Sequence, residues 1–284
     1  MNLQGIEKFE PVIAAIIVAL TLGAVGYGIW RSLQFGRAMF DRSNVPEGMS
    51  GELLEGLNAV IERFRKLKVD SIRLAGLGSG SWYANLIRMY IQAHVRRVLT
   101  LIDAGNAELA VGRPLVVEMC SRAVYESVAC FCDFSKQLGP LLDGGDYEKV
   151  DDFLRTRIFA TRVSEFVTAD STVSATSILT QIDKLDKVQP RTRAAYDHLS
   201  DIVHPNALGT VIYFGSLGDD GVMSLPDETT STQRARDSLV AAALMLLHFD
   251  MALHDLEQRL QRLVVVTPKG LSVIERDQNN REQT

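Results

Sequence analysis

The sequence predicts an all-α protein, a helical bundle with a small β-hairpin and one N-terminal transmembrane helix. Three observations predict this class: apolar residues recur at helical spacing, glycine and proline separate the helical segments, and one uncharged apolar run lies near the N-terminus. Of the 284 residues, 46% are hydrophobic, and 30 Lys+Arg against 35 Asp+Glu give a net charge of -5. This composition excludes a disordered chain and a generally basic protein that coats nucleic acid.

The apolar run at residues 12–30 reads VIAAIIVALTLGAVGYGIW and carries no charged side chain. At ~1.5 Å per residue, a helix of this length spans about 28 Å, close to the hydrocarbon thickness of a bilayer. Tyr27 and Trp30 end the run and Arg31 and Arg37 follow it, which places the C-terminal side in the cytoplasm. We therefore expect a single-pass protein of the cell inner membrane whose C-terminal domain is cytoplasmic.

Two alternatives compete with this membrane-spanning helix. A cleaved signal peptide would use Ala24-Val25-Gly26 as its small-residue cleavage site, and a soluble protein would bury the same run in its core. Within the run, Ala15, Ala19 and Gly23 recur every four residues and would let two helices approach closely. A homodimer through the transmembrane helix is therefore one hypothesis for a partner.

The rest of the chain is predicted to form one helical domain between polar ends. The expected parts are a short tail (1–11), the membrane helix (12–30), a juxtamembrane linker (31–43), a cytoplasmic helical domain (44–266) and a flexible tail (267–284). Apolar periodicity and helix-end residues predict helices over 52–67, 82–102, 114–138, 147–166 and 174–187. A short helix opened by Pro190 and a long final helix follow.

Glycine and proline residues mark the expected turns. The cluster at 75–80 is interpreted as a turn between helices, because it matches neither GxxxxGK[ST] nor GxGxxG. Gly139-Pro140 is expected to end the third helix. The segments 210–217 and 222–225 are rich in β-branched and aromatic residues around a glycine-rich turn, which predicts a β-hairpin.

The final helix has a continuous apolar seam over residues 239–263. Its members alternate steps of three and four and are Leu239, Ala242, Leu246, Phe249, Leu253, Leu256, Leu260 and Leu263. The first half has a second apolar face formed by Val240, Leu244, Leu247 and Met251, so this half is expected to be buried. The seam either covers another helix of the same chain or forms a homodimer.

Cysteine usage favours a reducing compartment. Cys120, Cys130 and Cys132 contain no CxxC pair and lie in an apolar helical stretch, so they are interpreted as small core residues. We expect neither a metal site nor a cofactor.

The segment 189–209 carries the first candidate site. On a helix that begins at Pro190, the side chains of Arg193, Tyr196, Ser200 and His204 share one face. His204 in the last turn would be favoured in its protonated form, and a cationic imidazole near an arginine suits phosphate binding or general acid catalysis. The alternative is structural, with these groups hydrogen-bonded to a neighbouring helix and fixing the turn that ends at Asn206.

A second candidate lies at the start of the third helix, where Arg113 precedes Glu118. Glu118 lies within an apolar run, so it is expected to be buried and to need a partner. Arg122, one turn further on, is the local choice for that partner. His204 or Arg193 across the bundle would instead indicate a functional site.

The Tyr196-Asp-x-Leu-Ser200 and His204-Pro205-Asn206 positions, with the Arg113-x4-Glu118 pattern, resemble a group of bacterial helical proteins similar to HEPN-type domains. The likeness covers about residues 110–260, and such domains occur in toxins, abortive-infection proteins and RNases. HEPN ribonucleases carry Arg-x4-His, which Arg193 and His198 match in spacing. The resemblance thus implies a HEPN-like bundle acting in defence or stress response, with Arg193, His198 and His204 as the catalytic candidates.

Two functions follow from these expectations. The first is a membrane-anchored cytoplasmic interaction or effector module, and the second is a metal-independent ribonuclease of the HEPN type that acts as a dimer. The net acidity favours binding over contact with RNA, because RNA requires a local basic patch. The only candidates for such a patch are Arg88, Arg96, Arg97, Arg155, Arg157 and Arg162.

Overall fold

A computed structural model describes residues 39–40, 45–46, 49–74, 80–225 and 232–265 of the chain. The chain divides into two units, Met1–Asp41 and Arg42–Thr284, and the described helices lie in the second. The predicted membrane helix at 12–30, the tails at 1–11 and 267–284, and most of the linker at 31–43 lie outside the described residues. The predicted turn at 75–79 lies outside them as well.

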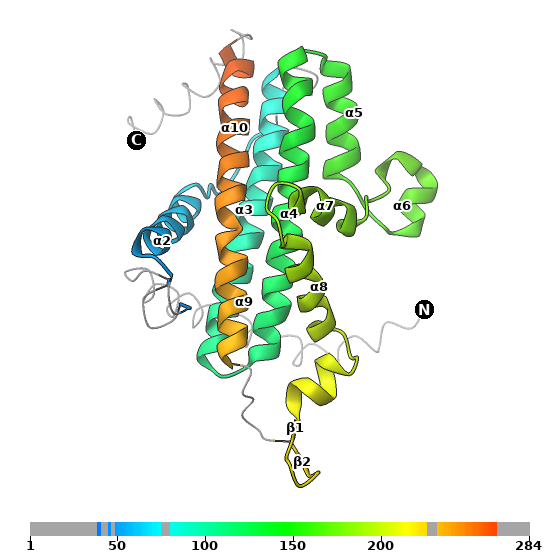
Figure 1. Ribbon diagram of the computed structural model, residues 1–284. Coiled ribbons are helices and arrows are strands. Elements are labelled where there is room, and N and C mark those ends of the chain that lie inside the picture. The colour runs from blue at the N-terminus through cyan, green and yellow to red at the C-terminus, as the bar shows by residue number, and fades with distance from the viewer. Residues whose placement is uncertain (1–38, 41–44, 47–48, 75–79, 226–231, 266–284) are drawn as a thin grey trace, which may run out of the picture. The chain divides into compact units, whose positions relative to one another are not determined.

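The described part of this unit is mainly α-helical (Figure 1). Its first helices are α2 (Gly51–Lys66), α3 (Gly80–Ala110), α4 (Pro114–Gly144) and α5 (Tyr147–Ile158). The short elements α6 (Ser164–Ala169), η2 (Ser171–Val173), α7 (Ile178–Asp186), α8 (Thr192–Val203) and η3 (Leu208–Ile212) follow. Strands β1 (Ser216–Leu217) and β2 (Met223–Ser224) form an antiparallel pair before α9 (Thr232–Leu244) and α10 (Leu246–Val265). The predicted all-α class is thus confirmed.

Helix α4 is the centre of the bundle and packs against α3, α5, α7, α8, α9 and α10. Its apolar residues surround the whole helix rather than following one stripe, and a helix with that pattern is buried. The buried side chains include Val117, Val124, Val128, Phe131, Phe134 and Leu138. The rings of Phe131 and Phe249 stack with centroids 3.9 Å apart and join α4 to α10.

The apolar seam of the final helix packs within the same chain. Its side chains from Leu239 to Leu260 are buried, and α9 and α10 contact both α3 and α4. The side chain of Leu263 lies outside the described residues. The expected burial of the second face is only partly correct, because Val240 is buried whereas Met251 is exposed. The seam therefore covers helices of its own chain, as one of the two interpretations expected.

Among the described residues, one helix is long and apolar enough to cross a membrane. It spans Thr232–Gln261, the combined length of α9 and most of α10, and half of its most apolar window is buried. A central helix of a bundle has the same length and composition, and the contacts with α3 and α4 give this helix that role.

The predicted end of the third helix at Gly139-Pro140 is wrong, because α4 continues to Gly144. Pro140 removes one backbone donor, but tertiary contacts hold the following turn in place. Leu142 is buried there, and Arg259 Nε of α10 donates to Asp143 Oδ2 over 3.0 Å. The helix stops at Gly145, whose φ of 68° gives the left-handed C-cap that favours glycine.

Two other predicted helices are shorter in the structure. The segment 147–166 divides into α5 and α6 because Thr161 leaves the helix to pair with another segment. Its amide donates to Val173 O over 2.8 Å, and its carbonyl accepts from Ala175 N over 2.9 Å. The same pairing keeps residues 174–177 extended, so α7 begins only at Ile178.

The predicted hairpin is reduced to two residues in each strand. Most of the segment 210–217 is helical instead, because Asn206 organises a turn directly after Pro205. Asn206 Oδ1 accepts from Gly209 N over 3.0 Å, and the Asn206 carbonyl accepts from Thr210 Oγ1 over 2.5 Å. Local side-chain hydrogen bonds of this kind compete with strand formation.

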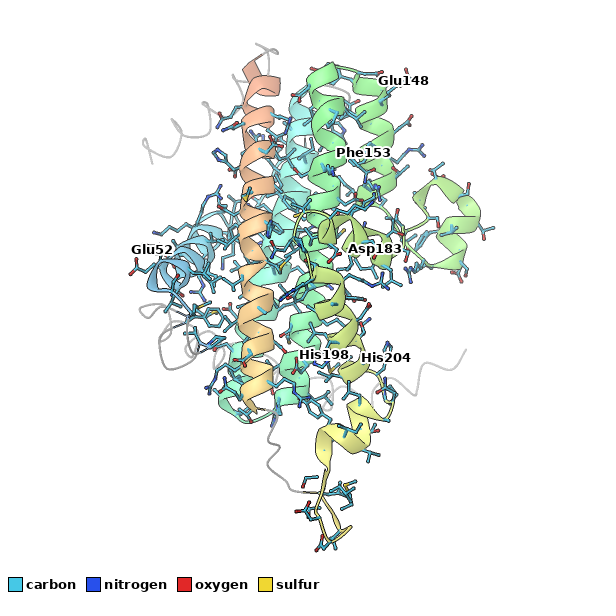
Figure 2. All side chains as sticks on the ribbon, viewed as in Figure 1. Glu52, Glu148, Phe153, Asp183, His198 and His204 are labelled. Carbon is cyan, nitrogen blue, oxygen red and sulfur yellow. The ribbon has the colours of Figure 1, made fainter. Side chains whose placement is uncertain are left out.

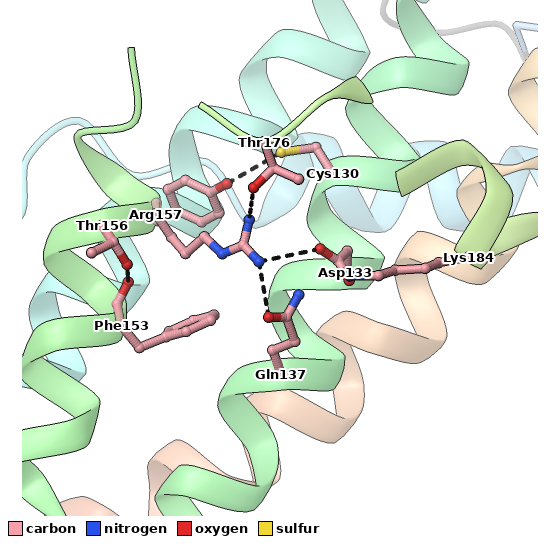
Figure 3. Close-up of polar contacts among 9 residues, drawn as sticks. Cys130, Asp133, Gln137, Phe153, Thr156, Arg157, Thr176 and Lys184 are labelled. Carbon is pink, nitrogen blue, oxygen red and sulfur yellow. Dashed lines mark hydrogen bonds and ion pairs between the residues drawn. The ribbon is translucent and has the colours of Figure 1, made fainter. Parts of the chain in front are cut away.

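A buried carboxylate on α4 holds two flanking helices (Figure 3). The side chain of Asp133 is 2% exposed, and its Oδ1 accepts a hydrogen bond from Lys184 Nζ of α7 over 2.7 Å. Its Oδ2 lies 3.6 Å from Arg157 Nη2 of α5. Arg157 also donates to Gln137 and Thr176 over 2.8 and 2.9 Å. Because a buried charge is costly without partners, Asp133 fixes the positions of α5 and α7.

Replacing Asp133 should therefore destabilise the bundle. We expect Asp133→Asn to lower the free energy of unfolding by about 2 kcal/mol, since it removes a buried charge-assisted hydrogen bond. Urea unfolding followed by circular dichroism measures this change. The control is Asp152→Asn, which removes an exposed ion pair with Arg155 and should cost less than about 0.5 kcal/mol. Equal effects of the two substitutions would contradict the role of Asp133.

Candidate functional site

Local hydrogen bonds fix both ends of helix α8, which carries the predicted polar face. At its start, Asp186 Oδ1 accepts from Arg193 N over 3.0 Å, and Thr192 Oγ1 donates to Gln189 O over 2.6 Å. At its end, His204 has an extended backbone, as a residue before proline prefers. The expectation that His204 occupies the last helical turn is therefore wrong, because it is the C-cap residue outside the helix.

The guanidinium of Arg193 is occupied by two carboxylates. Its Nη1 lies 2.5 Å from Asp183 Oδ1 of α7, and its Nε donates to both oxygens of Asp197 over 2.9 and 2.8 Å. The hydrogen bonds to Asp197 and Asp183 raise the pKa of Arg193 above its ordinary value. The charge is thus balanced by two carboxylates at the protein surface, which weakens it as a site for phosphate.

The two candidate histidines lie apart from this cluster. His198 and His204 are exposed, and neither ring forms a hydrogen bond with another described residue. Figure 2 shows Asp183 on α7, with the two histidines further along the chain on α8 and just after it. No hydrogen bond or ring contact joins Arg193 to either histidine within the described residues, so the three predicted catalytic side chains share no polar contact.

Tyr196 faces α4 and belongs to a small buried network. Its hydroxyl donates to Glu126 Oε1 over 3.0 Å and accepts from Arg122 Nη2 over 3.3 Å. Arg122 Nε lies 3.3 Å from Glu126 Oε1, and the Arg122 guanidinium lies 5.5 Å from the centroid of the Tyr196 ring. These contacts satisfy a buried phenol, as the structural interpretation of this face expected.

The remaining members of the predicted face have separate roles. Ser200 Oγ is buried and has no hydrogen-bond partner among the described residues. The side chain of Asn206 caps the turn at 208–212, as described above. Tyr196 and Asn206 therefore support the fold through their hydrogen bonds.

Glu118 is fully buried on α4, as its sequence context predicts, but neither of its carboxylate oxygens has a hydrogen-bond partner among the described residues. The expected pair with Arg122 is wrong because Arg122 turns to Glu126, and neither His204 nor Arg193 contacts Glu118. Burial raises the pKa of Glu118, and Ser238 and Arg234 of α9 lower it by a smaller amount. Arg113, at the start of α4, is exposed and pairs with Glu108 over 3.3 Å.

The described residues contain no group of three or more His, Cys, Asp or Glu side chains placed to hold a metal ion. Cys120, Cys130 and Cys132 are free thiols. Burial raises the pKa of Cys132 to about 12, so this thiol stays protonated near neutral pH. Cys120 is buried, in agreement with the interpretation of the sequence, whereas Cys130 and Cys132 are half-buried.

An exposed apolar surface is the feature that sequence reasoning did not find. We call residues 208–225 the tip, because this segment leaves the end of α8 and extends away from the helices (Figure 1). Tyr213 is its main buried side chain. The exposed ones are Val211, Ile212, Phe214, Leu217, Val222, Met223 and Leu225. The sequence predicts a β-hairpin here, and only the fold reveals that these side chains are exposed.

Glycines hold the tip in place. A Cβ atom at Gly209 would overlap with the carbonyl oxygens of His204 and Ile202, so only glycine permits this approach to the end of α8. A Cβ at Gly215 would lie 2.5 Å from Val211 O and 2.8 Å from Met223 Sδ. The tip therefore has a defined conformation in which its apolar side chains are displayed.

Comparisons of the chain with family models, curated proteins and solved structures found no match.

The network around Tyr196 gives a test of the structural role of α8. We expect Tyr196→Phe to lower the free energy of unfolding by about 1 kcal/mol, because it removes the hydroxyl bonded to Glu126 and Arg122. His204→Ala changes an exposed side chain, so its free energy of unfolding should stay within about 0.5 kcal/mol of that of the parent. Urea unfolding of both variants measures the difference. A larger loss for His204→Ala would show that this interpretation of the face is wrong.

The buried Glu118 predicts a pH-dependent difference between two proteins. Its pKa is raised above the ordinary 4.5, so the stability that it contributes is fully present below about 4.5 and is lost as the pH rises through its folded pKa. Glu118→Gln stays neutral, so we expect its stability to match the parent at acid pH and to exceed it at neutral pH. Denaturation over a pH series measures this, with the exposed Glu62→Gln as the control. Parallel curves for Glu118→Gln and the parent would contradict the prediction.

Proposed function

We propose that this chain is a membrane-tethered helical interaction module that contacts a protein partner through its tip. The observation that carries the proposal is the cluster of exposed apolar side chains at residues 211–225. Contiguous apolar surface on a soluble domain usually marks an interaction site, because its exposure to water is unfavourable. Anchoring through residues 12–30, with the helical domain in the cytoplasm, is part of the same proposal.

The charge at the end of the tip favours a protein over a lipid surface. Asp219 and Asp220 are exposed in the turn between β1 and β2, beside Leu217 and Val222. Carboxylates are repelled by anionic lipid headgroups and are costly to place in hydrocarbon. Apolar side chains next to carboxylates fit an apolar groove on a protein that has lysine or arginine at its rim. The short strands β1 and β2 could also extend a sheet of that partner.

The ribonuclease alternative has less support. It depends on the spacing of Arg193 and His198, yet the Arg193 charge is balanced by Asp183 and Asp197. Its HEPN-like fold remains an expectation from the resemblance alone. Purified chain that cleaves RNA, with the activity lost in His198→Ala, would favour this alternative over the interaction module.

Site-specific photocrosslinking in cells tests the proposal on the full-length chain. The probe benzoylphenylalanine replaces Leu217 in one protein and Met251 in the other, because both side chains are 69% exposed. We expect a discrete protein adduct at position 217 and none at position 251. Charge reversal at Asp219 and Asp220 to lysine should reduce the adduct, since it removes the complementarity with a basic rim.

Equal adducts at the two positions, or labelling of lipid alone at position 217, would contradict the proposed contact. The anchor is tested separately by membrane fractionation. The full-length chain should sediment with membranes, and a chain that lacks residues 1–40 should remain in the supernatant.

A further inference from the structure

A second surface of the molecule has the composition of a small-molecule site. An open pocket of about 440 Å³ lies between the α7–α8 turn, the start of α2 and the junction of α9 with α10. Its walls are mostly apolar and include Leu53, Ala241, Leu244 and Leu247. Pockets that bind small molecules are typically of this size, with apolar walls and a few polar groups that orient the ligand.

Arg191 brings a permanent positive charge to the lining of this pocket, and its backbone is strained. Arg191 has φ 78° and is the only non-glycine residue with a positive φ among the described residues. This region is unfavourable for an arginine because of its Cβ, and such strain is often retained where a side chain has a task. Arg191 is exposed, and its guanidinium has no ion pair or hydrogen bond within the described residues, unlike that of Arg193 two positions later.

Two further polar features belong to the same pocket. Tyr125 lines it and makes no hydrogen bond with its hydroxyl among the described residues. Burial raises the pKa of Tyr125, so the hydroxyl is a neutral donor at physiological pH. Gln189 Oε1 lies 3.1 Å from His248 Nε2, and this contact joins the α7–α8 turn to α10 at the pocket.

We propose that this pocket binds a small amphipathic anion, an apolar body that carries one carboxylate. The apolar body packs against Leu244 and Leu247, and the carboxylate pairs with the unpartnered guanidinium of Arg191. Arginine suits this role because its planar fork matches the two oxygens of a carboxylate. The Tyr125 hydroxyl supplies a further donor. This inference concerns a different surface from the tip and does not depend on the proposed partner.

The test uses 2-naphthoate as the ligand and 2-naphthalenemethanol as its neutral match. The full-length chain is embedded in phosphatidylcholine nanodiscs, and empty nanodiscs correct for partition of the probe into lipid. Isothermal titration should show that naphthoate binds at least about tenfold more tightly than the alcohol, the factor expected for one charged hydrogen bond.

The decisive variant is Arg191→Gly, which removes the charge and suits the positive φ at the same time. We expect it to raise the unfolding midpoint and to weaken naphthoate binding about tenfold. Arg191→Lys should retain part of the preference for the acid, and Arg113→Gln, an exposed arginine outside the pocket, should bind like the parent. A stabilised Arg191→Gly that binds naphthoate as the parent does would overturn the proposal. Equal binding of acid and alcohol, or no binding of the acid to the parent, would overturn it too.

Discussion

The carboxylate of Asp133 is the constraint on which the arrangement of the flanking helices depends. It lies on α4, the helix that contacts most of the others, and it is nearly inaccessible to water. A charge in this position needs cations, and Lys184 of α7 and Arg157 of α5 supply them. Those two contacts place the short helices on the bundle, and the position of α7 in turn sets where the α7–α8 turn and α8 begin.

Hydrogen bonds and ion pairs to neighbouring helices also hold the polar face of α8. Tyr196 meets Glu126 and Arg122 of α4, and Arg193 meets Asp183 of α7, so the polar groups are used to hold α8. Two surfaces remain open to solvent, one at each end of α8. The turn before it presents Arg191 at an apolar pocket, and the tip after it displays apolar side chains to solvent.

Local patterns in the sequence were sufficient to predict much of this fold. The spacing of apolar residues predicted the bounds of α2 to within one residue at each end. The apolar seam of the final helix correctly predicted which of its faces is buried. The apolar context of Glu118 correctly predicted its burial. These features depend on residues a few positions apart, which is the range over which periodicity is informative.

Features that depend on distant contacts could not be predicted in this way. Pro140 looks like a helix end until the pairing of Arg259 with Asp143 is known, and the choice of Arg122 between Glu118 and Glu126 is made by Tyr196 of another helix. The exposure of the tip is a similar case, because a pattern that predicts a β-hairpin does not show which of its side chains are covered by other elements. Such outcomes require the packing of the whole bundle.

Hydrogen exchange of the full-length chain most directly tests the central claim, that α4 holds the bundle together while the tip is a free surface. The backbone amides of residues 120–138 should exchange in the slowest class, since they open only with global unfolding. The amides of residues 211–225 should exchange fastest among the described segments, because few buried contacts protect them. Early exchange within α4, or protection of the tip equal to that of α4 in the isolated chain, would contradict the claim.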